Sequence, residues 1–441
     1  MVPVMHWTTP EDRRNFGQSR RKQVGRQEHD ALNVRARTLT ALALLERTER
    51  GRLPALLSLK HQLMSQSPSA YFRGAACVMA ADLAVLPNTG IEAQLCGDAH
   101  VRNLGAFAAP DGRLVFDIND FDESIRGPFE WDLKRMATSL IVAGRESNHK
   151  ESSARHAVES CIGRYCAQMR AFSKMPMIEV ARYQVHRLGG IQPVHEALTK
   201  AERATPLRTL ERLTEETSNK PGIPRRFKES KPILNRLAPG QAEQVLQALG
   251  AYRETIEPQR QHLFSMYRPI DVAFKVVGKG SIGLRDYCVY FEGNGPEDPL
   301  FLQVKEEAPS VYSPYVPNAH PVLHNGQRVV MGQRAMQVQS DPFLGWTNVG
   351  SRQFMVRQLN DHRGSIELED LAGPGLVAFG EVCGELLARG HARSGDPLVI
   401  AGYLGPGNTF AEALGRFGSL YADQTERDWQ ALRRSGKVRV N

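Results

Sequence analysis

The chain has 441 residues, of which 41% are hydrophobic and 24% charged. This composition supports a sizeable buried core and excludes wholesale disorder, and the length predicts two or three packed units. No window approaches about 18 uncharged apolar residues, so we expect no membrane span. Residues 1–26 are polar and arginine-rich, without the apolar segment of a secretory signal, which predicts a cytoplasmic protein. A net charge of +8 permits an anionic partner without identifying one.

The cysteine content predicts buried, reduced thiols. Six cysteines in a chain of this length are too sparse for a disulfide framework, and none of them forms a C-x-x-C motif. The closest pair, Cys161 and Cys166, lies in a stretch with helical periodicity. A metal or redox role remains the alternative for these residues.

The first half of the chain is predicted to be mainly helical. Residues 1–60 are rich in arginine and are expected to form a basic arm on the body of the protein. Pro68 follows Ser67, a favoured start for a helix, and helical periodicity continues over about 154–260. Pro110-Asp111-Gly112 is a turn sequence between two short strands. The strands expected here are 91–95, 104–108 and 114–118.

The second half begins with a β-rich segment. From about residue 270, short β-branched or aromatic runs alternate with Gly- and Pro-bearing turns, which predicts a small, mostly antiparallel sheet. Helices are expected again after Gly364, and Thr409 with Glu412 is predicted to form the capping box of the last one. The chain thus divides into a basic arm (1–60), a helical lobe (61–265), a β lobe (266–362) and C-terminal helices (363–441).

Two polar segments of the first half contain residue types that a phosphoryl-transfer site requires. Asp98 precedes Asn103 by five residues, the spacing between the catalytic base and a metal-binding Asn in protein kinases. After the predicted hairpin comes Asp120-Phe121-Asp122, where a second magnesium ligand is expected. An ordinary pair of acidic turns is the alternative.

A glycine-rich segment occurs in the second half. Gly278-Lys279-Gly280-Ser281-Ile282-Gly283 leads into a predicted strand and not into a helix, which argues against a dinucleotide-binding fold. A glycine-rich loop between two strands is how kinases cover the phosphates of ATP. Lys305 ends the next predicted strand, where kinases place the lysine that pairs with these phosphates. A glycine-rich hairpin with a surface lysine is the alternative.

These motifs resemble known families at two levels. The pattern G-D-x-H-x-x-N followed by D-F-D resembles the small-molecule branch of the protein-kinase-like superfamily, which includes aminoglycoside and choline phosphotransferases. More closely, motifs over about residues 15–435 are similar to those of a bacterial family termed domain of unknown function 2252. The segments that carry this second resemblance are Ser67-Pro68, Phe72-Arg73-Gly74, Trp131-Asp132-Leu133-Lys134-Arg135, Gln303-Val304-Lys305-Glu306, Gly332-Gln333-Arg334, Ala388-x-x-His391-Ala392-Arg393 and Tyr421-Ala422-Asp423-Gln424.

The resemblance implies a role for the acidic and amide residues of the two polar segments and for Asp132. Asp98 would be the catalytic base, and Asn103 with Asp120 would hold Mg²⁺. Asp132 would support the catalytic loop from a later helix, with Asp122 as a further supporting residue. His100 would be either a structural hydrogen-bonding group or an acid–base group. The residues that would bind ATP lie in the glycine-rich segment and at the end of a later strand. They are Gly278, Gly280, Ser281, Gly283 and Lys305.

The order of the motifs departs from that of ordinary kinases. Lys305 follows Asp120 by 185 residues, whereas the kinase lysine precedes the catalytic loop. The sequence therefore predicts an α+β, two-lobed, protein-kinase-like fold that is circularly permuted, with the catalytic helical lobe first and the β lobe second. Permutation is tolerated because chain termini commonly lie close together on the surface.

The partner of Lys305 is a second departure. The helix expected at about 326–339 contains no carboxylate, because none occurs between Glu307 and Asp341. Lys305 would therefore be held by Glu306, by Glu307 or by an amide of that helix. The candidate amides are those of Gln327, Gln333 and Gln337.

The expected activity is transfer of the γ-phosphoryl group of Mg-ATP to a hydroxyl of a small molecule or a protein. The alternatives are a nucleotide-binding regulator of the pseudokinase type and an adenylyl transferase. The later Gly-Asp-x-x-Asp and Gly-Asn-His of metallophosphoesterases are absent, as is a Walker loop. Thr199 stands where a zinc protease helix beginning at His195 needs its second histidine. The basic arm lacks interleaved aromatics, so nucleic acid is not an expected partner.

Overall fold

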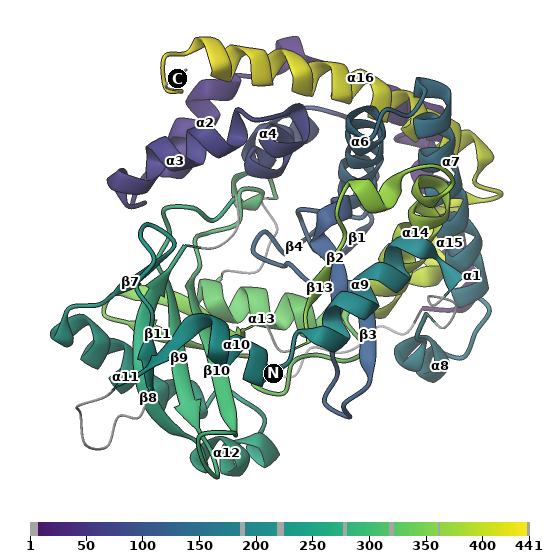
Figure 1. Cartoon of the computed structure of the whole chain (residues 1–441). Coiled ribbons are helices and arrows are strands. Elements are labelled where there is room, and N and C mark those ends of the chain that lie inside the picture. The colour runs from purple at the N-terminus through teal and green to yellow at the C-terminus, as the bar shows by residue number, and fades with distance from the viewer. Residues whose placement is uncertain are drawn as a thin grey trace.

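The computed structural model describes residues 8–185, 190–217, 225–276, 280–316, 322–359 and 362–438. The chain has the predicted α+β class: helices form the larger part and a six-stranded antiparallel sheet forms the smaller one (Figure 1). No helix among the described residues has both the length and the apolar character needed to cross a bilayer. All six cysteines are buried and unpaired, as predicted.

The described N-terminal residues pack on the helical part of the protein. The apolar side chains of helix α2 (Ala41–Glu49) are buried with those of helix α5 (Ala76–Ala84). Arg13 pairs with Asp396 at 2.7 Å, and Arg37 contacts Asp82 at 2.6 Å and Asp428 at 3.0 Å. The ion pairs with Asp396 and Asp428 bind the first 40 residues to the last 50. The helices of this region are α1 (Pro10–Ser19), α2 (Ala41–Glu49), α3 (Pro54–Met64), α4 (Pro68–Gly74) and α5 (Ala76–Ala84).

Five further helices form the core of the larger part. They are α6 (Glu130–Glu146), α7 (Glu151–Phe172), α14 (Gly375–Ser394), α15 (Pro397–Leu404) and α16 (Asn408–Arg434). Helices α7 and α14 approach closely because α14 has glycines at the contact; a Cβ on Gly384 would lie 2.0 Å from the carbonyl oxygen of Cys161. The capping box predicted at Thr409 is absent, since the last helix begins after Gly407, which has a φ of 95° and provides no side-chain cap.

Two small sheets position the polar segments of the first half. The predicted hairpin is confirmed as β2 (Leu104–Ala108) and β3 (Leu114–Ile118), with β13 (Gly364–Ser365) on its edge. The strand β1 (Glu92–Leu95) pairs with β4 (Ile125–Pro128). Residues 96–103 therefore connect β1 to β2, and residues 119–124 connect β3 to β4, so both segments leave the two sheets at neighbouring points.

The smaller part is built on the six-stranded sheet, with the order β11-β12-β10-β9-β8-β7. Every neighbouring pair is antiparallel. The helix α13 (Asn325–Met336) packs against β12. The strands are β7 (Leu234–Arg236), β8 (Arg268–Lys275), β9 (Asp286–Glu292), β10 (Pro299–Glu306), β11 (Gly345–Val349) and β12 (Arg352–Gln358).

The boundary between the two parts lies earlier than residue 265. Helices α11 (Pro239–Arg253) and α12 (Pro258–Ser265) were expected in the helical lobe, but Tyr252 and Phe264 are buried against Val289 and Phe291 of the sheet. The intervening segment also contains short strands that periodicity did not predict. The remaining elements there are α8 (Met177–Arg182), α9 (Gln192–Arg203), α10 (Pro206–Leu213), β5 (Thr214–Glu216) and β6 (Arg225–Phe227).

Because α7 and α14 are in close contact, a single methyl group added at Gly384 is expected to lower the stability of the protein strongly. Gly384→Ala should destabilise the protein by about 1–3 kcal/mol, because the new Cβ overlaps backbone atoms that cannot move easily. Gly163→Ala on α7 is the matched control: its Cβ meets nothing within 4 Å, so this variant should gain about 0.5–1 kcal/mol. Urea unfolding of both variants measures the difference, and equal stabilities would contradict the described helix contact.

Candidate functional site

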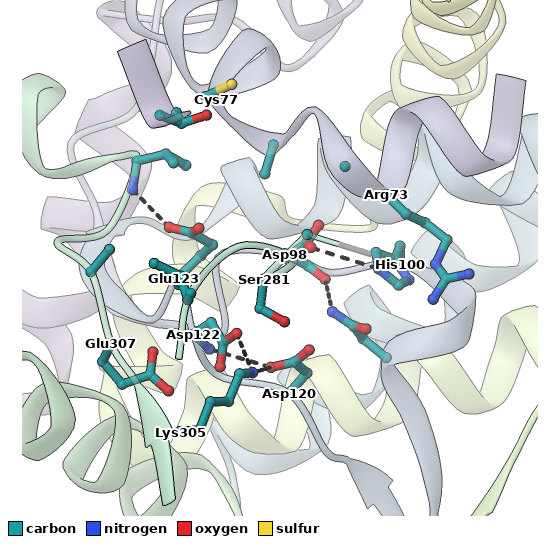
Figure 2. Close-up of a pocket in the computed structure, with 18 of the residues that line it drawn as sticks. Arg73, Cys77, Asp98, His100, Asp120, Asp122, Glu123, Ser281, Lys305 and Glu307 are labelled. Atoms are coloured by element: carbon teal, nitrogen blue, oxygen red, sulfur yellow. Dashed lines mark hydrogen bonds and ion pairs between the residues drawn. The ribbon is translucent and has the colours of Figure 1, made fainter. Parts of the chain in front are cut away.

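A cavity between the two parts brings together residues from both halves of the chain (Figure 2). Eight residues predicted for the site line it, although they lie as far apart in sequence as positions 98 and 305. They are Asp98, His100, Asn103, Asp120, Asp122, Gly280, Ser281 and Lys305. Gly283, Asp132 and Glu306 lie outside its wall, and Gly278 lies outside the described residues.

Lys305 joins the sheet to the helical part. It stands at the end of β10, and its Nζ forms a short ion pair with Asp122 and lies 4.0 Å from Oδ1 of Asp120. Its side chain is only 5% exposed. Burial opposes the charge, but the two carboxylates outweigh it and raise the pKa of Lys305, so the ammonium group stays protonated.

Glu306 does not hold Lys305, contrary to one of the sequence expectations. Successive residues of a strand point to opposite faces, and Glu306 pairs with Arg352 at 2.5 Å and with Arg285 at 3.1 Å. Glu307 lines the cavity, and its Oε1 is buried without a hydrogen-bond partner in the described parts of the chain. Burial raises the pKa of Glu307 well above its usual value.

The three glutamines considered as partners of Lys305 point elsewhere. Gln333 donates to Gln337 at 3.0 Å, and Gln337 donates to the carbonyl of Ile118 at 2.5 Å. Gln327 lines a separate hollow at the start of α13. Lys305 is therefore paired with the aspartates of the D-F-D segment, and its partner comes from the helical part.

Asp98 is fixed by a buried arginine. The guanidinium of Arg135, on α6, donates to Oδ1 of Asp98 at 2.5 Å, and Nδ2 of Asn103 donates to the backbone carbonyl of Asp98 at 2.8 Å. Burial raises the pKa of Asp98, although Arg135 acts in the opposite direction. Oδ2 of Asp98 lies 3.6 Å from Nε2 of His100, and Asp98 lines the cavity.

His100 has the hydrogen bonds of a structural residue. Its Nδ1 accepts from the backbone N–H of Arg102 at 3.2 Å, which places the ring proton on Nε2. Burial, together with the charge of Arg73, lowers the pKa of His100 well below its ordinary value. The imidazole is therefore neutral, and it orients the loop that carries Asp98.

Asp132, on α6, supports the loop that carries Asp98 through hydrogen bonds to its backbone. Its two carboxylate oxygens accept from the backbone N–H groups of Cys96 at 2.9 Å and Gly97 at 3.0 Å. His391 contacts Oδ2 of Asp132 at 3.3 Å. Gly97 has a φ of 83°, and a Cβ there would lie 2.2 Å from the carbonyl oxygen of Glu123, so only glycine fits. Asp132 thus positions the loop without lining the cavity.

Asp120 and Asp122 offer hard oxygen ligands. Burial and the neighbouring charge of Asp122 raise the pKa of Asp120. For Asp122 burial acts in the same direction, but Lys305 outweighs it and holds the pKa below its usual value. Oδ1 of Asp122 is buried without a hydrogen-bond partner. These carboxylates and the amide of Asn103 fit Mg²⁺, which takes one or two protein ligands and completes its shell with phosphate oxygens and water.

The described residues contain no group of three or more His, Cys, Asp or Glu side chains arranged to hold a metal ion. A structural metal site built from protein ligands alone is therefore not present in this part of the chain.

A clasp from the N-terminal helices holds the glycine-rich loop. Arg52, between α2 and α3, donates through Nη1 to the carbonyls of Gly280 at 2.9 Å and Ile282 at 2.6 Å. The N–H of Leu53 donates to the carbonyl of Gly283 at 2.7 Å. Gly283 has a φ of 94° and serves this contact, not the cavity. Gly280 and Ser281 are the residues of the loop that face the cavity.

Several lining residues were not predicted from the sequence. Arg52 lies in the segment taken for a surface arm, and Arg357 lies in a strand recognised only by its β character. Arg73 stands in a family motif to which no role was attached. The same is true of Arg135, which binds Asp98 without lining the cavity. Glu123 directly follows a predicted site residue, and only the three-dimensional arrangement shows that it faces the cavity. Glu307 was considered in the sequence as a partner of Lys305 and not as a residue of the cavity wall.

Asp286 lies behind Lys305 on the neighbouring strand. Its Oδ2 accepts from Nε2 of Gln303 at 2.6 Å, and its Oδ1 is buried without a hydrogen-bond partner. Burial raises the pKa of Asp286 to about 7, and burial likewise raises the pKa of Glu123 to about 7. Both carboxyl groups therefore take up or release protons near neutral pH.

Comparison with known proteins identifies the family. The family model described as an uncharacterized protein conserved in bacteria (DUF2252) matches residues 52–435, and the chain belongs to this family, which confirms the resemblance noted in the sequence. No curated protein and no solved structure matches the chain.

The raised pKa of Asp286 predicts how stability changes with pH. The folded protein keeps this carboxyl protonated up to about pH 7, whereas the unfolded chain releases the proton near its ordinary pKa of about 4. Stability is therefore lost as pH rises through this window. Asp286→Asn cannot ionise, so its loss of stability between pH 5 and pH 8 should be smaller than that of the wild type by at least about 1.4 kcal/mol.

Urea unfolding at the two pH values measures this difference. Asp111→Asn is the control, because Asp111 lies in an exposed turn where it pairs with Arg113. This variant should follow the wild type. A slope for Asp286→Asn equal to that of the wild type would show that the carboxyl group ionises normally in the folded state.

Proposed function

We propose that this member of the family is a Mg-ATP-dependent phosphotransferase, which moves the γ-phosphoryl group of ATP to a hydroxyl of a small molecule or a protein. The observation that carries the proposal is the meeting of Lys305 with Asp120 and Asp122 in one cavity, beside Asp98. A lysine that contacts phosphates, carboxylates that bind Mg²⁺ and a carboxylate that accepts a hydroxyl proton are the groups this reaction needs.

The element order of the sheet also supports a kinase-like, circularly permuted fold. From β8 onwards, Lys305 lies on the third strand, the glycine-rich loop lies between the first two, and α13 follows the lysine strand. Protein kinases carry their lysine on the third strand and follow it with a helix. In those enzymes a glutamate of the helix pairs with the lysine, whereas here Asp122 of the helical part does so.

The proposed division of labour follows the contacts. Oδ1 of Asp98 is held by Arg135, so Oδ2 would accept the proton of the acceptor hydroxyl while the hydroxyl oxygen bonds to the γ-phosphorus and the bond to ADP breaks. Lys305 would move from Asp122 to the phosphate oxygens, and Gly280 with Ser281 would cover them. Mg²⁺ held by Asn103 and Asp120 would neutralise the charge that develops on the phosphates.

A nucleotide-binding regulator of the pseudokinase type is the second candidate. It is favoured by the firm pairing of Lys305 with Asp122 and by the absence of a carboxylate from α13. Both features would suit a cavity that binds a nucleotide without turning it over. Adenylyl transfer on the same fold is the outcome to be excluded by labelling.

The first test of the proposal concerns binding. Lys305→Ala should weaken Mg-ATP binding by about 1–3 kcal/mol, because it removes a charge-assisted hydrogen bond in a largely buried site. Lys231→Ala, whose side chain is 74% exposed, is the matched control and should bind as the wild type does. Isothermal titration calorimetry with Mg-ATP measures both. Equal Mg-ATP affinities in the wild type and both variants would show that Lys305 does not contact the nucleotide.

The second test concerns turnover. Asp98→Asn should reduce release of γ-phosphate by about 100- to 10,000-fold and leave Mg-ATP affinity unchanged, because a general base contacts the acceptor and not the nucleotide. Asp120→Asn should in addition weaken magnesium-dependent nucleotide binding. Wild-type turnover should rise with pH through the raised pKa of Asp98, since only the carboxylate accepts a proton.

ATP labelled separately at the γ- and α-phosphates distinguishes the candidates. Transfer or slow release of the γ-label supports the phosphotransferase. Binding without turnover in the wild type, even with cell-extract metabolites supplied, favours the regulator. The α-label on protein would replace the proposal with adenylyl transfer.

A further inference from the structure

Arg73 is a cation of the cavity with no partner among the described residues. It stands in the last turn of α4 and lines the cavity, and its Nε is buried without a hydrogen bond. The neighbouring arginines are all engaged within the described parts of the chain. Arg135 binds Asp98, Arg52 binds carbonyls of the glycine-rich loop, Arg357 binds Gln303 and the carbonyl of Asn119, and Arg102 binds Glu367.

The position of Arg73 separates it from Lys305. In Figure 2, Arg73 and His100 lie to the right of Asp98, whereas Lys305 lies below and to the left of it, beside Asp120 and Asp122. Burial lowers the pKa of Arg73, and the charge of Arg102 acts in the same direction, while Asp98 and Asp120 act against both. The guanidinium nevertheless stays charged, because the ordinary pKa of arginine is above 12. A bound anion at this point would compensate a charge that the described side chains leave without a direct contact.

We propose that Arg73 binds an anionic group of the acceptor. This inference rests on the proposed phosphotransferase function and narrows its substrate class: the acceptor is a hydroxyl compound that also carries a phosphate or a carboxylate. Asp98 contacts the acceptor hydroxyl in the proposed reaction, so a cation on the side of Asp98 away from Lys305 meets the acceptor and not the nucleotide.

The guanidinium suits this role by its shape as well as its charge. Its planar array of N–H groups binds two oxygens of a phosphate or carboxylate at once, which fixes the orientation of the bound molecule. An acceptor held in this way at Arg73 would present its hydroxyl to Oδ2 of Asp98. Arg73 therefore contributes both affinity and positioning for the acceptor.

Inorganic phosphate is the probe for the test. Isothermal titration calorimetry should detect phosphate binding to the wild type, and Arg73→Gln should weaken it at least about tenfold, as expected for loss of a charge-assisted contact. Arg113→Gln alters an exposed arginine that pairs with Asp111 of its own turn, so it is the matched control and should keep the wild-type phosphate affinity.

Mg-ATP titration of the same variants separates this inference from the proposed function. Arg73→Gln should bind Mg-ATP as the wild type does. If Mg-ATP binds to none of the proteins, the proposed function fails, while the phosphate titration still reports on Arg73. Arg73→Lys keeps the charge without the planar fork, and it should bind phosphate with intermediate affinity; it also replaces Arg73→Gln if that variant does not fold.

Three results would overturn the inference. One is a wild type that does not bind phosphate, and another is a phosphate affinity lost in Lys305→Ala but retained in Arg73→Gln. The third is a loss of Mg-ATP affinity in Arg73→Gln equal to the loss in Lys305→Ala, which would assign Arg73 to the nucleotide.

Discussion

The ion pair of Lys305 with Asp122 joins the two parts of the molecule, and the geometry of the cavity depends on it. Removing a lysine from water is costly, and this one is only 5% exposed. The cost is offset because two carboxylates from the D-F-D segment meet it at the end of β10. That contact sets the face of the sheet that carries Gln303 and Lys305 against the helical part, and it leaves Glu306 on the opposite face with its own arginines.

The carboxyl groups in and behind the cavity differ in whether a cation or a hydrogen bond contacts each of their oxygens. Asp98 has Arg135, and Asp122 has Lys305 at one of its oxygens. The other oxygen of Asp122, one oxygen of Glu307 and one of Asp286, behind Lys305, are buried without a hydrogen bond from the described residues. Burial raises the pKa of Glu307, of Asp286 and of Asp120. Perturbed carboxyl groups gathered in a cleft are common at functional sites, where stability is given up for reactivity. The lysine pair would also have to loosen whenever phosphates enter, so this contact suits a site that rearranges on binding.

Local patterns in the sequence predicted the elements that depend on near neighbours. The hairpin of β2 and β3 followed from its turn residues, and the α+β class followed from the change of periodicity near residue 270. The positions of Asp98 and Lys305 were found through motifs. The exclusion of Glu306 was within reach of the sequence as well, because a lysine that faces the cavity from a strand obliges the next residue to face away.

Contacts between distant segments account for what the sequence did not predict. Arg13 and Arg37 bind residues near the C-terminus, so a segment that resembles a solvated arm is part of the folded body. Helices α11 and α12 have the periodicity of any amphipathic helix, which does not indicate the surface they cover. The capping box predicted at Thr409 is absent because Gly407, with a positive φ, is the N-cap and starts the helix two residues earlier than the motif requires.

The clasp of Arg52 and Leu53 on the glycine-rich loop has a consequence for how the cavity opens. In a two-lobed protein whose loop is free, the loop can lift while both lobes stay still. Here the loop is bonded to the link between α2 and α3. Helix α2 is packed on α5, and Arg37, which precedes α2, pairs with Asp428 of α16. Lifting the loop therefore means breaking three hydrogen bonds or carrying α2 and α3 along, so entry of a ligand is mechanically linked to the N-terminal helices.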